Sequence, residues 1–201
     1  MLVGNLFTQF ASDASQVSGM VNFLNALLSA GCILFLFWSI TRLVRALLVG
    51  DERKLSVMDV IIILGAGFVG ALAYTFSDTF WFSAVEGEVY AFSSFLTALV
   101  FWMILRWQDE ADSVSGDRWI ILIAYIIGLS IGVHLLNLLC IPAIVLVFYY
   151  QKYQTLSLKG VIGAIALSGI LIVLILFVYI PGMADVGAVS YTHLRAHETK
   201  A

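Results

Sequence analysis

Long apolar runs separated by short polar segments form the dominant pattern of this sequence. A helix needs about 20 consecutive apolar residues to cross the hydrocarbon core of a bilayer. Four runs approach or exceed this length and predict membrane spans at about 20–41, 57–76, 88–105 and 160–180. Because backbone polar groups in lipid must bond within their own segment, we expect these spans to be α-helices.

The apolar stretch between the third and the last of these runs is too long for one ordinary span. It carries His134, Asn137 and Pro142 near its middle, and proline disfavours a helical conformation in the residue before it. We therefore predict a tight turn here that joins two short spans, at about 118–134 and 138–151. A single kinked helix is the alternative.

The composition indicates that these apolar helices belong to a membrane protein. Hydrophobic residues make up 62% of the chain and charged residues 11%, against about 25% charged in ordinary soluble domains. We expect an all-α polytopic integral membrane protein with about six transmembrane helices within residues 1–187. Cys32 and Cys140 lie in apolar runs and are interpreted as buried small hydrophobes. No basic patch with interleaved aromatics indicates nucleic acid as a partner.

The positions of the charged residues predict the orientation. The basic residues before residue 190 are Arg42, Arg45, Arg53, Lys54, Arg106, Arg118, Lys152 and Lys159. Six spans place all of them on one side, which the positive-inside rule makes cytoplasmic. The other side receives Asp13, Asp78, Glu86, Glu88 and Asp185. We therefore expect a multi-pass membrane protein with loop 77–88 outside the cytoplasm, whereas a single kinked helix would place Lys152 and Lys159 outside.

Two motifs resemble ligand sites and are interpreted otherwise. Residues 65–70, Gly-Ala-Gly-Phe-Val-Gly, match a dinucleotide fingerprint but lie inside a predicted span, where small residues allow close helix packing. His193 and His197 are spaced as a metal pair on a helix. However, the segment 188–201 departs abruptly from the preceding composition and resembles a translated sequencing adapter. We expect it to be a non-native or disordered tail without function.

The loop that precedes the third span carries the candidate chemistry. Glu86 and Glu88 stand two residues apart among aromatic residues that include Trp81 and Tyr90. One interpretation is a solvated helix cap, because acidic residues in a first turn complement the helix dipole and aromatic residues favour the membrane interface. The other is a functional carboxylate that acts as a base, binds a divalent metal or orients a substrate.

The predicted turn between the two short spans supplies a second set of candidates. His134 and Asn137 are expected on the same outer side as Glu86, and together with Trp81 and Tyr90 they are candidate substrate-binding residues. A hydrogen-bonded structural histidine is the alternative. If a lipid phosphate is handled on this side, only His134, backbone N–H groups or a bound metal could meet its charge.

Three segments of the chain resemble a known family. They are VNFLNALLSAGCILFLFWSITRL, FSDTFWFSAVEGEVYAFSSFLTALVFWMILRW and DRWIILIAYIIGLSIGVHLLNLLCIPAIVLVFYY. They resemble a bacterial family of polytopic membrane proteins, first catalogued as a domain of unknown function and similar to the GT-C glycosyltransferases near the protein O-mannosyltransferases. The resemblance implies sugar transfer from a polyprenyl-phosphate donor to an acceptor protein or glycan at the outer face of the membrane.

The resemblance also implies where this chain departs from the family. The family's principal catalytic carboxylate is expected in a loop after the first span, with a WDCGEF motif followed by HPPG, and neither motif occurs here. We therefore expect an N-terminally truncated, inactive fragment in which Glu86 and Glu88 are supporting catalytic residues. A transporter or lipid flippase is the alternative function, and a noncatalytic assembly subunit is a third.

Overall fold

The computed structural model describes residues 2–49, 54–87, 89–111, 113, 116–153 and 157–198. Within these ranges the regular elements are helices, and no strand occurs. Four helical segments are long and apolar enough to cross a membrane: Ala14–Leu48, Val57–Thr75, Tyr90–Glu110 and Leu158–Val189. The expected class, an all-α membrane protein, is confirmed.

Two further apolar helices are shorter than a typical span. Helix α6 (Gly116–Ile131) has 16 residues, and α7 (Cys140–Lys152) has 13 residues. Between them lies the 3-10 helix η2 (Leu135–Leu139), at the position of the expected turn. Because neither α6 nor α7 reaches the length of about 20 residues that a bilayer core requires, the number of six spans stays a prediction.

The chain divides into two compact units, Met1–Cys140 and Ile141–Ala201. The first unit, called unit 1 here, begins with the short helices α1 (Leu2–Thr8) and η1 (Ala14–Gln16). It continues through α2 (Val17–Leu48), α3 (Val57–Thr75), α4 (Asp78–Val85), α5 (Tyr90–Glu110), α6 and η2. The described residues 78–85 of the expected outer loop are therefore helical.

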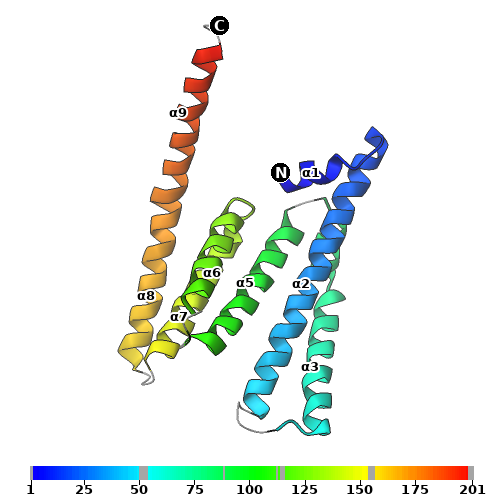
Figure 1. Cartoon of the computed structure of the whole chain (residues 1–201), viewed down its shortest axis with the longest axis vertical. Helices are drawn as coiled ribbons and strands as arrows, with labels where there is room; N and C mark the ends of the chain where they lie inside the picture. The colour runs from blue at the N-terminus through cyan, green and yellow to red at the C-terminus, as the bar shows by residue number, and fades with distance from the viewer. Residues whose placement is uncertain are drawn as a thin grey trace. The chain divides into compact units, whose positions relative to one another are not determined.

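Helix α2 is the centre of unit 1 and lies between α3 and α5 (Figure 1). It runs parallel to α5, because Cys32 contacts Ser94 and Arg42 contacts Asp109 in the same order along both helices. Asn25, earlier on α2, contacts Glu86 just before α5 begins. Helix α3 runs back beside α2, and α6 runs back beside α5. This arrangement gives unit 1 two ends with different chemistry.

Close packing between α2 and α3 depends on the glycine motif at residues 65–70. A Cβ atom at Gly67 would collide with the side chain of Thr41 and would lie 3.0 Å from the ring of Phe37. A Cβ atom at Gly70 would lie 2.7 Å from Cδ1 of Ile40. These glycines let the two backbones approach closely, as small residues commonly do in membrane helices.

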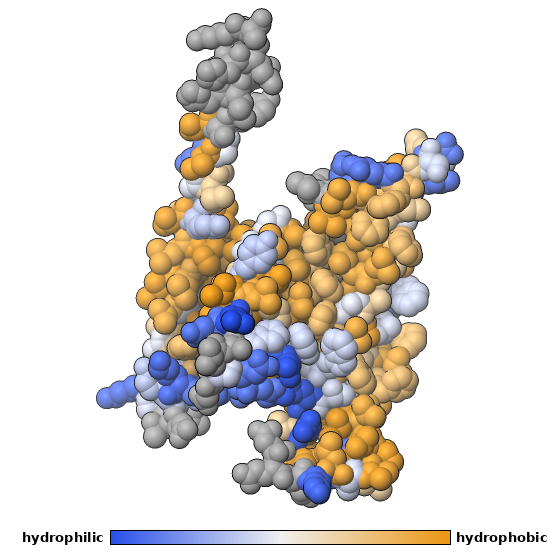
Figure 2. All heavy atoms as spheres, viewed as in Figure 1, coloured by the Kyte–Doolittle hydropathy of each residue, from blue (hydrophilic) through white to orange (hydrophobic). Residues whose placement is uncertain are grey.

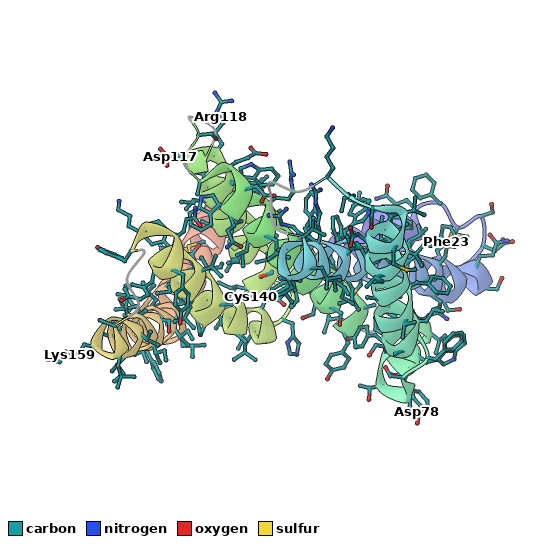
Figure 3. The ribbon with its side chains drawn as sticks, turned by 90° about the horizontal axis from the view of Figure 1, so that it is seen from below. Phe23, Asp78, Asp117, Arg118, Cys140 and Lys159 are labelled. Carbon is teal, nitrogen blue, oxygen red and sulfur yellow. The ribbon has the colours of Figure 1, made fainter. Side chains whose placement is uncertain are left out.

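Charged residues gather at the end of unit 1 that holds the C-terminal turns of α2 and α5, called the basic end here. Arg42 forms an ion pair with Asp109, and Arg106 Nη2 lies 2.9 Å from Oε1 of Glu110. Trp119 Nε1 donates to Oε2 of Glu110 over 2.9 Å, which ties α6 to the same cluster. Figure 3 shows Arg118 at the start of α6, extending away from the ribbon.

Large hydrophobic side chains lie on the outer surfaces of the helices. Val69 on α3 is 67% exposed and Ile121 on α6 is 69% exposed. Figure 2 shows hydrophobic residues over most of the visible surface along the helices. Soluble proteins rarely expose contiguous apolar surfaces of this extent, so lipid is the environment that this surface fits.

The second unit contains most of α7, then α8 (Leu158–Leu174), a π-helical turn (Ile175–Tyr179) and α9 (Ile180–Glu198). Ser157 caps the start of α8 by accepting a hydrogen bond of 3.0 Å from the backbone N–H of Gly160. A Cβ atom at Gly160 would overlap the ring of Tyr149, so α7 and α8 lie in close contact there. Residues 188–198 of the expected tail belong to α9, and a non-native origin for them stays a prediction.

Candidate functional site

The acidic loop connects α4 to α5 at the end of unit 1 opposite the basic end. Helix α4 ends at Val85, and the backbone N–H of Glu86 donates to the carbonyl of Phe82 over 3.0 Å. The Glu86 side chain is exposed. Glu88 lies outside the described residues, so its predicted role has no structural counterpart here. Of the two candidate carboxylates, Glu86 is therefore the one whose surroundings can be described.

The loop is attached to α2 through Asn25. The Nδ2 atom of Asn25 donates to the backbone carbonyl of Glu86, across 61 residues of sequence. Gly87 also lies against α2, because a Cβ atom there would be 3.4 Å from Cγ1 of Val21 and 3.6 Å from Oδ1 of Asn22. The path of the loop is thus defined by two adjacent turns of α2.

A cavity of about 770 Å³ opens beside this loop. Its walls come from α1, α2, the loop, the first turns of α5 and the turn after α6. Within the described chain, the residues that line it are all uncharged: Val3, Gly4, Asn5, Thr8, Val21, Leu24, Asn25, Leu28, Gly87, Val89, Phe92, Gly132 and Val133. The polar groups of the wall are the neutral side chains of Asn5, Thr8 and Asn25. The cavity therefore suits a largely apolar ligand that also carries hydroxyl or carbonyl groups.

Two predicted binding residues meet where the start of α5 approaches the turn after α6. The rings of Tyr90 and His134 lie 5.5 Å apart between centroids, with an angle of 53° between their planes. The backbone N–H of His134 donates to the carbonyl of Ser130 over 2.9 Å. Tyr90 follows Val89, and His134 follows Val133, and both of these neighbours line the cavity. The two rings contact each other, but neither Tyr90 nor His134 is itself a lining residue of the cavity.

Asn137 is a buried residue of η2 whose side chain faces α5. It is 2% exposed, and its Oδ1 accepts hydrogen bonds from Ser93 Oγ, over 3.3 Å, and from Thr97 Oγ1. Its Nδ2 has no hydrogen-bond partner within the described structure. The sequence analysis missed Ser93 and Thr97, although two hydroxyl residues one helical turn apart in an apolar span are a signal of a buried polar contact.

Trp81 is separated from the other candidates. It lies on α4, is 55% exposed and lines a second, apolar cavity of about 420 Å³. Residues of α2, the end of α3 and α4 form that cavity, among them Ala30, Thr75 and Phe80. Glu86, Tyr90 and His134 are thus sequence neighbours of residues that line the larger cavity without lining it themselves, whereas Trp81 lines the other cavity.

A divalent metal ion would need several oxygen ligands. Within the described residues, no group of three His, Cys, Asp or Glu side chains lies close enough together to hold a metal ion. Glu86 is the described carboxylate beside the larger cavity, and one carboxylate does not make such a site. The donor set described here does not fit a metal centre, and no chemical step is assigned to one.

Comparison with known proteins adds one finding to this geometry. The family model of the protein O-mannosyl-transferase TMEM260 N-terminal domain matches residues 1–157. This range contains α1 through α7 and therefore every residue of the larger cavity. No curated protein and no solved structure matches the chain.

Proposed function

We propose that this chain, which belongs to the protein O-mannosyl-transferase TMEM260 N-terminal domain family, is part of a membrane glycosyltransferase. The proposed reaction transfers a sugar from a polyprenyl-phosphate donor to a hydroxyl group of an acceptor protein or glycan. The proposed location is the outer face of a bacterial inner membrane, and the proposed architecture is of the GT-C type. The observation that carries the proposal is the cavity of about 770 Å³ beside Glu86.

The size and lining of this cavity support a donor of that class. Pockets for small molecules commonly measure about 300–1,000 Å³ and are mostly apolar, with a few polar groups that fix the orientation of the ligand. Here the apolar wall would accept part of an isoprenoid chain. The neutral amide of Asn5 and the hydroxyl group of Thr8 would bond to sugar or acceptor hydroxyl groups.

The proposed roles of the candidate residues follow from their positions. Glu86, with its exposed carboxylate, assists in orienting or deprotonating the acceptor hydroxyl, and Glu88 has the same supporting role. The ring pair of Tyr90 and His134 offers a stacking surface for the sugar. His134 and backbone N–H groups would meet the phosphate, because the described Lys and Arg residues of unit 1 do not line this cavity.

The principal base is proposed to lie on an acidic loop that these 201 residues do not contain, so the chain alone is expected to be inactive. The outer location of the cavity is supported by the charge distribution of unit 1. Arg42 and Arg106 lie at the opposite ends of α2 and α5 from Glu86. A helix of 21 residues such as α5 is about 30 Å long, which matches the thickness of a bilayer core.

The test is a transfer assay on the full-length protein in membranes, with a radiolabelled polyprenyl-phosphate sugar and an acceptor peptide rich in serine and threonine. Glu86→Gln and Glu88→Gln are each expected to lower kcat by about tenfold or more, because positioned acid–base groups contribute at least that much. Asp117→Asn, an exposed carboxylate at the start of α6, is the matched control and is expected to retain full activity.

Unchanged turnover and donor binding in both glutamine variants would remove the catalytic assignment and leave the loop as a helix cap. Movement of the labelled lipid between leaflets without transfer of sugar would favour the flippase alternative instead.

A further inference from the structure

We infer that Asn25 is a positioning residue that holds Glu86 and Gly87 of the acidic loop at the mouth of the larger cavity. The attachment itself rests on contacts within unit 1. Its consequence for sugar transfer rests on the proposed function. The sequence did not indicate a role for Asn25, because this residue lies inside an apolar span and far in sequence from both the acidic loop and the turn at His134.

The first contact is the hydrogen bond from Asn25 Nδ2 to the carbonyl of Glu86. Asn25 is 4% exposed, so its amide is held away from water. A buried amide without a partner costs free energy, and the bond to Glu86 offsets that cost. The carbonyl of Glu86 in turn accepts a hydrogen bond from α2, a helix that packs against both α3 and α5.

The second contact confirms that the loop lies along the same face of α2. Gly87 approaches Val21 and Asn22 closely enough that a Cβ atom would already be in contact with both. Val21 and Asn25 are one helical turn apart and therefore share a face of α2. Together these contacts fix the backbone on both sides of the Glu86–Gly87 peptide.

This geometry links Asn25 to the position of the carboxylate. The Glu86 side chain is exposed, while its own carbonyl is bonded to α2. Gly87, Val89 and Asn25 itself all line the cavity. The distance between the Glu86 carboxylate and a bound ligand is thus determined by where Asn25 holds the loop.

Hydrogen–deuterium exchange on the full-length protein in lipid nanodiscs tests the attachment. In Asn25→Leu, which keeps the branched shape of the side chain and removes the donor, amide exchange in a peptide spanning the loop is expected to be faster by about fivefold or more. Asn25→Gln, which keeps a donor, is expected to recover part of the protection. Phe23→Leu, at an exposed neighbour on α2, is the control and is expected to leave exchange in the loop unchanged.

Unchanged exchange in Asn25→Leu would overturn the inference. So would an equal increase at the basic end of α5, because that pattern would show general unfolding rather than release of the loop. Exchange is measured without substrate, so this result stands whether or not the protein transfers sugar.

The kinetic consequence is measured separately. If the proposed function holds, Asn25→Leu is expected to lower kcat by about tenfold, with a smaller change in the KM for the donor, because the carboxylate is displaced while the cavity is retained. Combination with Glu86→Gln is expected to add little further loss. Faster loop exchange with unchanged kcat would overturn the positioning role and leave only a structural attachment.

Discussion

Two buried asparagines determine the local structure around the cavity. Asn25 attaches the acidic loop to α2, and Asn137 attaches the turn before α7 to Ser93 and Thr97 of α5. The sequence allowed the turn to be predicted, because His134, Asn137 and Pro142 interrupt an apolar run. It could not reveal the partners of either asparagine, since the hydrophobic pattern reports local periodicity and these contacts join residues at least 40 positions apart.

A double-mutant cycle at Asn137 and Thr97 tests the second attachment. Asn137→Ala is expected to destabilise the protein by about 1–2 kcal/mol, and the coupling energy with Thr97→Val is expected to be about 0.5–1.5 kcal/mol. Unfolding in detergent micelles, followed by circular dichroism, measures both values. Strictly additive effects of the two substitutions would show that the hydroxyl and the amide do not interact.

At the scale of elements, the pairing of α2 with α3 depends on small residues within a span. The position of α3 (Val57–Thr75) was predicted from its apolar run alone, and the structure adds a capping box of Ser56 and Asp59 at its start. The interpretation of residues 65–70 as a packing motif agrees with the close contacts of Gly67 and Gly70. Helix α4 was not predicted, because its eight residues are too few to show a helical period clearly.

Gly67 and Gly65 provide a matched pair of substitutions in one helix. Gly67→Ala is expected to destabilise the protein by about 1–3 kcal/mol, because its Cβ atom would collide with Thr41. Gly65→Ala is expected to be neutral or to stabilise by up to about 1 kcal/mol, because a Cβ atom there meets nothing within 4 Å. Thermal unfolding of the two purified variants compares them. Equal losses at both positions would contradict the role of Gly67 in the contact with α2.

At the scale of the molecule, the membrane class followed directly from composition, since no soluble core could bury so much apolar surface. The number of spans did not follow, because α6 and α7 have lengths between those of buried and spanning helices. Along the helix axes of unit 1, the ion-paired Arg42 and Arg106 lie at one end, separated from Glu86 at the other. This separation predicts that the cavity faces away from the cytoplasm.

Cysteine labelling in intact cells checks this orientation. In a background with Cys32→Ala and Cys140→Ala, a cysteine introduced by Asp78→Cys at the start of α4 is expected to react with a membrane-impermeant maleimide. One introduced by Asp117→Cys at the start of α6 is expected to react only after lysis. Both native carboxylates are exposed and extend from helix ends, as Figure 3 shows. The reverse pattern would place the cavity in the cytoplasm.

The parallel course of α2 and α5 has a consequence for biosynthesis. Arg42 is paired with Asp109 in the folded protein, but Asp109 is synthesised roughly 70 residues later, which takes about 3–13 s at ribosomal rates of about 5–20 residues per second. During this interval Asp109 is not yet available to Arg42. Because a charged side chain is costly to move through the bilayer, we expect Arg42 to keep this end of α2 on the side of the membrane where it is made, before α5 is complete.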